Sequence, residues 1–203
     1  MAEDTASRSE RNLRLFVALA FPDEVRAELR RVADAMRAFA PSGTRWANLD
    51  GAHLTLRFIG STPHDAAPAL GEAVARAADG IAPFGLSLGT AGIFPAHGAP
   101  RILWVGVDGA RDALAALRDR VEDELATAGL PREDRAFSPH VTLARVNARL
   151  SRDEAHTLRE AITALDVRPI PFPVEEIGLY HSDLLPTGAV YTCLASALLH
   201  PFS

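Results

Sequence analysis

Two short segments of the chain share one pattern, in which a histidine and a threonine alternate with apolar residues. Residues 53–56 read HLTL and residues 140–143 read HVTL. Successive side chains of a β-strand point to opposite faces, so the His and Thr of each segment share one face and the apolar residues share the other. The pattern therefore predicts two strands that each bury an apolar face and present an imidazole beside a hydroxyl.

A single copy of this pattern is most simply a histidine at the wet edge of a sheet. Ordinary residue usage gives the pattern after a given His roughly once in a hundred, and the chain holds only seven His. Two chance copies are therefore improbable, and the repetition favours a paired functional site. We expect the other five histidines to be solvated or structural.

The composition narrows the class of protein. A chain of 203 residues is one domain, or two small lobes that share a core. The single Cys193 excludes an intramolecular disulfide and clustered cysteine ligands for zinc, which fits a reducing cytoplasm. The net charge of −5 argues against a broad basic surface that coats nucleic acid, but it leaves room for a focal phosphate site. All basic residues are Arg, so a lysine nucleophile and a P-loop lysine are excluded.

The change from polar to apolar residues near position 13 indicates where the folded domain begins. Residues 1–12 are polar and charged, and we expect them to form a disordered tail without a signal peptide. The apolar run at residues 13–21 is too short to span a bilayer, so we expect no membrane partner. We expect a cytoplasmic monomer in which residues 13–203 form one bilobal domain.

Apolar periodicity and turn residues predict an alternation of strands and helices. The expected strands lie at residues 13–21, 44–48, 52–59, 84–94, 101–107, 137–146, 171–181 and 189–199. Four amphipathic helices are expected between them, with starts near Pro22, Thr62, Leu114 and Ser151. We therefore predict an α+β fold with pseudo-two-fold symmetry, in which two lobes, each with an antiparallel sheet and two helices, face a central cleft. One motif strand is expected on each side of the cleft.

Two facing histidines suit an in-line displacement at phosphorus. Histidine titrates near neutral pH, so one imidazole can deprotonate the attacking group while the other protonates the leaving oxygen. The threonine hydroxyls can donate to the non-bridging oxygens, where charge gathers in the transition state. This arrangement requires no metal and no cofactor. A zinc site is a weaker interpretation because further ligands at metal-like spacing are missing, and no Walker or Rossmann glycine pattern is present.

Several stretches around the motifs resemble the 2H phosphoesterase superfamily. They are most similar to its LigT-like branch, the RNA 2′,3′-cyclic phosphodiesterases once described as 2′-5′ RNA ligases. The resemblance covers residues 13–199. It rests on residues 13–19 (LRLFVAL), 45–46 (RW), 53–60 (HLTLRFIG), 100–104 (PRILW) and 139–145 (PHVTLAR).

The resemblance implies metal-independent hydrolysis of a 2′,3′-cyclic phosphate at an RNA end, which leaves a 2′-phosphomonoester. It implies that His53 is the proton donor to the 3′ oxygen and that His140 is the proton acceptor for water, although the residues alone allow the opposite assignment. Thr55 and Thr142 would hold the phosphate. Arg145 is a further candidate for phosphate binding, but strict alternation sends it to the opposite face unless a bulge follows Thr142.

Other interpretations keep the same cleft. The chain could be a non-catalytic module that binds nucleotides or RNA ends. It could also act on another substrate, such as an ADP-ribose cyclic phosphate, a 2′-5′ oligonucleotide or a small cyclic nucleotide, and 2′-5′ ligation could occur as the reverse reaction. Of the two residues that follow the first motif, Arg57 has the parity of the face that carries His53 and Thr55, and we expect it to be solvated at the cleft rim. We expect Phe58 to lie in the core rather than to stack on a base.

Overall fold

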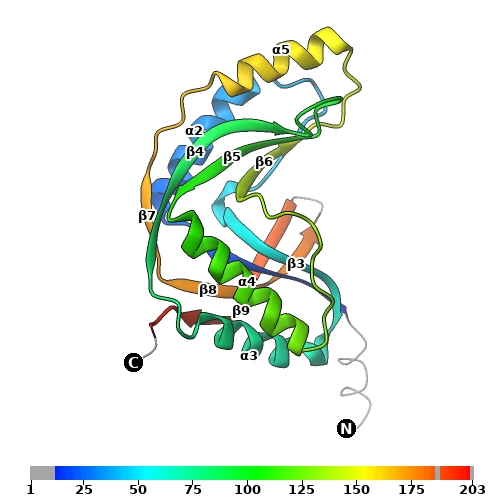
Figure 1. Ribbon diagram of the computed structural model, residues 1–203. Helices are drawn as coiled ribbons and strands as arrows, with labels where there is room; N and C mark the ends of the chain where they lie inside the picture. Colours follow the sequence, from blue (N-terminus) through cyan, green and yellow to red (C-terminus); the bar gives the residue numbers. More distant parts are fainter. Residues whose placement is uncertain (1–11, 186–187, 202–203) are drawn as a thin grey trace.

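The computed structural model describes residues 12–185 and 188–201, which fold into two lobes (Figure 1). The expected tail at residues 1–12 lies outside the described residues except for Asn12, which begins the first strand. Within the described ranges, no helix is both long enough and apolar enough to cross a membrane.

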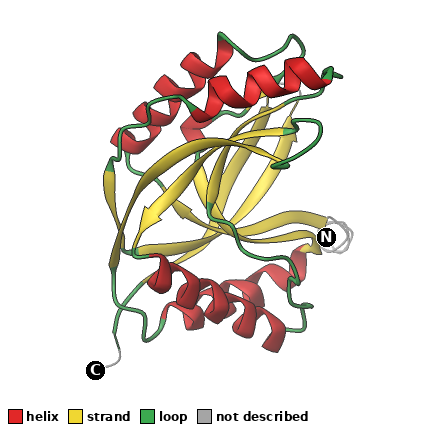
Figure 2. Ribbon diagram, turned by 45° about the horizontal axis from the view of Figure 1, so that its top comes forward, coloured by secondary structure: helices red, strands yellow, loops and turns green. Residues whose placement is uncertain are grey.

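Two antiparallel sheets form the centre of the molecule, as the sequence predicted (Figure 2). The first sheet has the order β3-β1-β8-β9 and the second has the order β2-β6-β5-β4-β7. The strands of the first sheet are β1 (Asn12–Ala20), β3 (His53–Pro63), β8 (Glu176–Leu185) and β9 (Gly188–Leu198). Those of the second are β2 (Arg45–Trp46), β4 (Phe84–Phe94), β5 (Ile102–Gly109), β6 (His140–Arg145) and β7 (Pro171–Val174). Each sheet therefore holds one motif strand, β3 or β6.

One expected strand is divided between the sheets. The sequence predicted a single strand over residues 171–181, but β7 pairs with β4 in the second sheet and β8 pairs with β1 in the first. The prediction of one strand was wrong. The apolar positions change phase where the chain crosses between the sheets, from Phe172 and Val174 to Ile177 and Leu179, and the sequence analysis did not use this shift. The two lobes are consequently not the two halves of the sequence.

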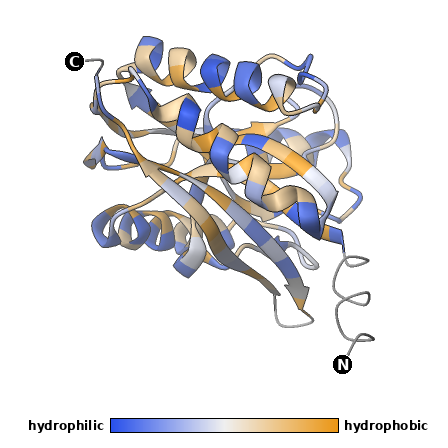
Figure 3. Cartoon of the chain, turned by 90° about the horizontal axis from the view of Figure 1, so that it is seen from below, coloured by the Kyte–Doolittle hydropathy of each residue, from blue (hydrophilic) through white to orange (hydrophobic). Residues whose placement is uncertain are grey.

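Four helices cover the outer faces of the sheets, and two of them pack on the sheet that their preceding strand does not join. They are α2 (Asp23–Arg37), α3 (Ala67–Ala78), α4 (Arg111–Thr127) and α5 (Arg152–Thr163). Helix α2 follows β1 of the first sheet but contacts β6 of the second, whereas α4 follows β5 of the second sheet but contacts β3 of the first. Helices α3 and α5 contact the first and second sheet, respectively. Hydrophilic and hydrophobic residues alternate along the helices in Figure 3, as expected for helices that bury one face.

A bulge follows the threonine of each motif strand. In the β1–β3 pairing Thr55 lies opposite Ala18 and Arg57 lies opposite Val17, so the intervening Leu56 has no partner. In the β5–β6 pairing Thr142 lies opposite Trp104 and Ala144 lies opposite Leu103, so the intervening Leu143 has no partner. An extra residue reverses the faces to which later side chains point. These two bulges therefore decide where the residues directly after each motif point, and β3 has a further bulge at Ile59.

A buried carboxylate joins α2 to the segment before β7. The side chain of Glu28 is 1% exposed and accepts hydrogen bonds from Arg31 Nε at 2.9 Å and from Arg168 Nε at 2.6 Å. The backbone N–H of Arg168 also donates to this carboxylate at 2.9 Å. Burial by itself would raise the pKa of Glu28, but these hydrogen bonds outweigh burial and lower it to about 2.

This lowered pKa predicts how stability depends on pH. The folded state favours ionised Glu28, so the stabilisation is present above the ordinary pKa of 4.5 and is lost as the pH falls towards 2. We expect Glu28→Gln to reduce the free energy of unfolding at pH 7 by about 2 kcal/mol, because two guanidinium groups lose a charged acceptor. Urea unfolding of both proteins at pH 7 and pH 3 measures this difference. An equal loss at both pH values would contradict a role for the ionised carboxylate.

Candidate active site

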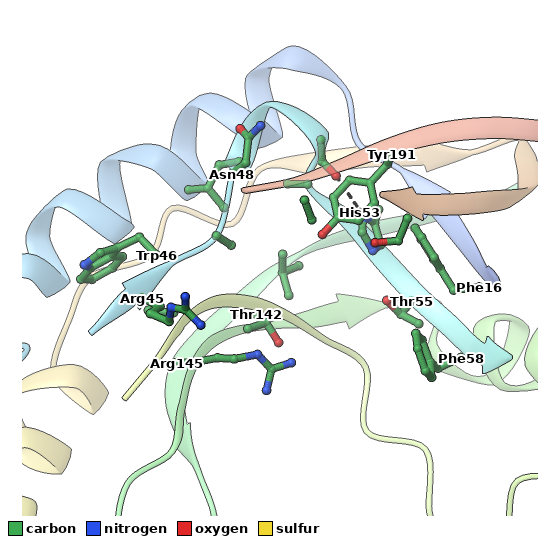
Figure 4. Close-up of a pocket in the computed structure, with 18 of the residues that line it drawn as sticks. Phe16, Arg45, Trp46, Asn48, His53, Thr55, Phe58, Thr142, Arg145 and Tyr191 are labelled. Atoms are coloured by element: carbon green, nitrogen blue, oxygen red, sulfur yellow. Dashed lines mark hydrogen bonds between the residues drawn. The ribbon is translucent and has the colours of Figure 1, made fainter. Parts of the chain in front are cut away.

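A cavity of about 410 Å³ lies between the two sheets (Figure 4). All five residues that the sequence singled out line it, namely His53, Thr55, His140, Thr142 and Arg145. The first two come from β3 and the other three from β6. Residues separated by more than eighty positions in the sequence thus meet at one site.

The two histidines are held in the same way. Nδ1 of His53 lies 2.9 Å from the carbonyl oxygen of Gly51, and Nδ1 of His140 lies 2.7 Å from that of Ser138. A carbonyl oxygen can only accept, so Nδ1 carries a proton and donates it in both hydrogen bonds. The neutral form of each imidazole therefore has an unprotonated Nε2, which can take up a proton.

Aromatic rings fix the orientation of both imidazoles. The ring of Phe16 stacks on His53 with 4.5 Å between centroids, and Tyr191 meets His53 edge-on at 4.8 Å. Phe94 meets His140 edge-on at 4.9 Å. These contacts restrict rotation of the rings about their side-chain bonds, so the hydrogen bond and the packing select one orientation together. The sequence analysis did not identify these aromatic residues.

Burial also changes the acidity of the first histidine. Desolvation lowers the pKa of His53 below its ordinary value of 6.5, and the hydrogen bond to Gly51 opposes this effect only in part. The imidazole of His53 is consequently neutral at pH 7 when the cavity holds no anion.

Positive charge gathers at the cavity although the chain is acidic overall. Arg14, Arg45 and Arg145 line the cavity, and none of the described residues that line it is acidic. Arg45 lies directly opposite Arg145 in the β2–β6 pairing, and both extend towards the cavity in Figure 4. The site is therefore suited to an anion. Within the described ranges, no three His, Cys, Asp or Glu side chains gather as a metal ion would require.

Sequence reasoning missed Arg14 and Arg45, although alternation supplied a signal for one of them. Arg14 is two residues before Phe16 on β1, so both share the face that carries the cavity. Arg45 belongs to a strand of two residues, which is too short for alternation to show its orientation.

The bulges explain three side chains that strict alternation misplaces. The bulge at Leu143 brings Arg145 back to the cavity. The prediction of a core position for Phe58 was wrong, because its ring is 44% exposed and borders the cavity, with the guanidinium of Arg14 at 4.5 Å from the ring centroid. The prediction that Arg57 is solvated at the rim was also wrong: its side chain is 10% exposed and pairs with a residue of α4.

Comparison with known proteins identifies a family and close structural neighbours. The sequence profile of the 2′-5′ RNA ligase superfamily matches residues 21–184. A protein of Thermus thermophilus named RNA 2′,3′-cyclic phosphodiesterase is 35% identical, over 90% of this chain and 88% of its own length. Relatives with the same name from Thermotoga maritima and Geobacillus stearothermophilus are 29% and 33% identical. The alignments cover 90% and 91% of this chain, with 93% of the Thermotoga protein but only 57% of the longer Geobacillus protein.

Solved structures of similar proteins have the same overall fold. The crystal structure of the Thermus thermophilus protein TT0787 superposes with a TM-score of 0.73 at 33% identity and covers 92% of this chain and 98% of that one. The structure of E. coli LigT complexed with 3′-AMP gives a TM-score of 0.69 at 27% identity, with 93% and 99% covered.

The environment of His53 predicts its titration in the unliganded protein. We expect NMR titration of its ring protons to give a pKa below 6.5, because the surroundings disfavour the charged imidazole. Phe16→Ala removes the stacked ring and should move this pKa back towards 6.5. Tyr191→Phe serves as the control, since it keeps a ring against His53 and removes only a hydroxyl. A pKa of 6.5 or higher in the intact protein would contradict this account.

Proposed function

The chain belongs to the 2′-5′ RNA ligase superfamily, and on this basis we propose that it hydrolyses RNA-terminal 2′,3′-cyclic phosphates to 2′-phosphomonoesters. One observation carries the proposal: two imidazoles with protonated Nδ1 atoms line one cavity together with two threonine residues and a cluster of arginines. These are the groups that acid–base catalysis at a phosphate needs.

In the proposed reaction the two imidazoles act on opposite sides of the phosphorus. His140 Nε2 accepts a proton from water, whose oxygen forms the new bond to phosphorus. The bond from phosphorus to the ribose 3′ oxygen breaks, and the Nε2–H of His53 gives its proton to that oxygen. The 2′ ester bond is retained. The hydroxyls of Thr55 and Thr142 and the guanidinium of Arg145 stabilise the negative charge on the non-bridging oxygens.

The role of His53 as proton donor depends on the substrate itself. Burial keeps this imidazole neutral in the empty cavity, which taken alone favours a proton acceptor. The cyclic phosphate carries a negative charge, and its arrival beside His53 raises the pKa of the imidazole. We therefore propose that the donor becomes protonated as the substrate binds.

The cavity also supports an RNA end as the substrate. Arg14 and Arg45 add positive charge beyond what one cyclic phosphate monoanion requires, so they are suited to a neighbouring phosphate of the chain. The exposed ring of Phe58 at the same cavity provides a surface on which an unpaired base can stack. We further propose that the protein acts on short RNA ends, as a monomer in the cytoplasm.

Small nucleotides are the second candidate substrates. Structures of E. coli LigT complexed with NADP+ and with ATP are similar to this chain at 28% and 26% identity. A cyclic phosphate on a mononucleotide or on ADP-ribose would use the same histidines but would make fewer contacts with Arg14 and Arg45. The reverse 2′-5′ ligation would use the same groups with their proton-transfer roles exchanged. A non-catalytic binding module is the remaining alternative, and it predicts binding without turnover.

The first test compares the wild type with His53→Ala and His140→Ala on a short RNA that ends in a 2′,3′-cyclic phosphate, with EDTA present. We expect the wild type to produce a 2′-phosphate and each variant to lose at least about 100-fold in kcat. Circular dichroism verifies that the variants fold. Wild-type turnover by either folded variant would contradict the two-histidine mechanism, and binding without turnover by the wild type would favour the binding module.

A second test assigns the donor and the acceptor. A substrate with sulfur in place of the bridging 3′ oxygen has a leaving group that needs little protonation. We expect this substrate to restore most of the rate of His53→Ala but not that of His140→Ala, because only the donor becomes dispensable. Rescue of His140→Ala instead would exchange the two roles.

A further inference from the structure

A buried ion pair connects the first motif strand to α4. The guanidinium Nε of Arg57 on β3 lies 3.1 Å from Oε1 of Glu122, whose side chain is 2% exposed. Nη2 of Arg118 lies 3.4 Å from the same carboxylate oxygen. A carboxylate this deeply buried depends on both guanidinium groups to balance its charge.

The same ion pair holds the loop that leads into the second motif strand. Nη2 of Arg57 donates to the carbonyl oxygen of Pro131 at 2.6 Å, and its Nη1 lies 3.4 Å from Oε2 of Glu133. The backbone N–H of Glu133 donates to Oε2 of Glu122 at 3.0 Å. Arg118 donates to the carbonyl oxygen of Glu133 at 3.4 Å. We refer to Arg57, Arg118, Glu122 and Glu133 as the loop anchor.

The anchored loop provides the hydrogen-bond acceptor of His140. The loop contains no helix or strand between the end of α4 at Thr127 and the start of β6. Its Ser138 carbonyl accepts from His140 Nδ1 at 2.7 Å. The preceding residue, Phe137, has its ring centroid 5.8 Å from the guanidinium of Arg118. The loop anchor therefore contacts this loop at Pro131, at Glu133 and at Phe137, the residue directly before Ser138.

We propose that Arg57 and Glu122 are positioning residues that act through this loop to fix the tautomer of His140. The loop anchor orients the Ser138 carbonyl, the carbonyl keeps the proton of the neutral imidazole on Nδ1, and Nε2 is left free to accept a proton. Because Arg57 lies two residues after Thr55 on β3, the first motif strand thereby supports the histidine of the second. The kinetic part of this inference rests on the proposed function, whereas the tautomer is independent of it.

The chain contains a matched control for this proposal. Glu28 is also a buried glutamate, 1% exposed, that is held by two arginines. It lies on α2 and does not line the cavity. Glu28→Gln and Glu122→Gln therefore each remove the charge of a buried glutamate that is held by two arginines, and only the second weakens the loop that supports His140. The arginines around Glu28 are the more exposed of the two sets.

The experiment measures kcat, KM and the side-chain ¹⁵N shifts of His140 in both variants. For Glu122→Gln we expect kcat to fall by about tenfold, as is typical when a hydrogen-bond partner behind an active-site ligand is lost. We expect KM within twofold of the wild type and a new fraction of the tautomer protonated at Nε2. Glu28→Gln should leave kcat and the tautomer unchanged.

Arg57→Lys provides a second variant that retains the positive charge. Lysine cannot hold Glu122 and the Pro131 carbonyl together as the planar guanidinium does, so we expect a smaller change in the same direction. Wild-type kcat and an unchanged His140 tautomer in folded Glu122→Gln or Arg57→Lys would overturn the proposal, as would an equal loss of kcat in Glu28→Gln. If the wild type itself is inactive on cyclic phosphate, the proposed function fails, and the tautomer still decides whether the loop anchor positions His140.

Discussion

One unpaired residue directly after each motif threonine sets the faces to which the following side chains point. Regular alternation would send Arg145 away from the cavity and Phe58 towards the core. The bulges at Leu56 and Leu143 reverse the faces after each threonine, so both side chains reach the cavity. The first bulge also turns Arg57 towards α4, where it pairs with a buried carboxylate. The lining of the cavity and the ion pair behind the strand thus arise from the same local irregularity.

The surroundings of the two histidines combine rigidity with positive charge. Each imidazole donates from Nδ1 to a carbonyl two residues earlier and packs against aromatic rings. Burial disfavours the charged form of His53 until an anion enters. The arginines of the cavity attract such an anion, although the chain as a whole is acidic. The cavity thus combines fixed imidazoles with positive charge that an anion would balance.

Much of this architecture follows from local sequence patterns. Alternation predicted both motif strands, and α5 begins after Ser151, near the expected helix start, with both hydrogen bonds of a capping box. The sequence analysis misplaced Arg57 and Phe58 because a bulge leaves no mark in apolar periodicity. The exchange of α2 and α4 between the lobes depends on long-range packing, which periodicity within one helix does not describe. The aromatic neighbours of His53 come from distant strands, so only the tertiary structure brings them together.

The exchanged helices make the two lobes one cooperative unit. Because α2 and α4 each cover the sheet that their own preceding strand does not join, neither lobe has a complete core if the other unfolds. Only residues 21–22 join β1 to α2, and only residue 110 joins β5 to α4, so the chain passes from one lobe to the other through very short connections. These two connections tether the lobes and limit how far the two motif strands, and with them the two imidazoles, can move apart.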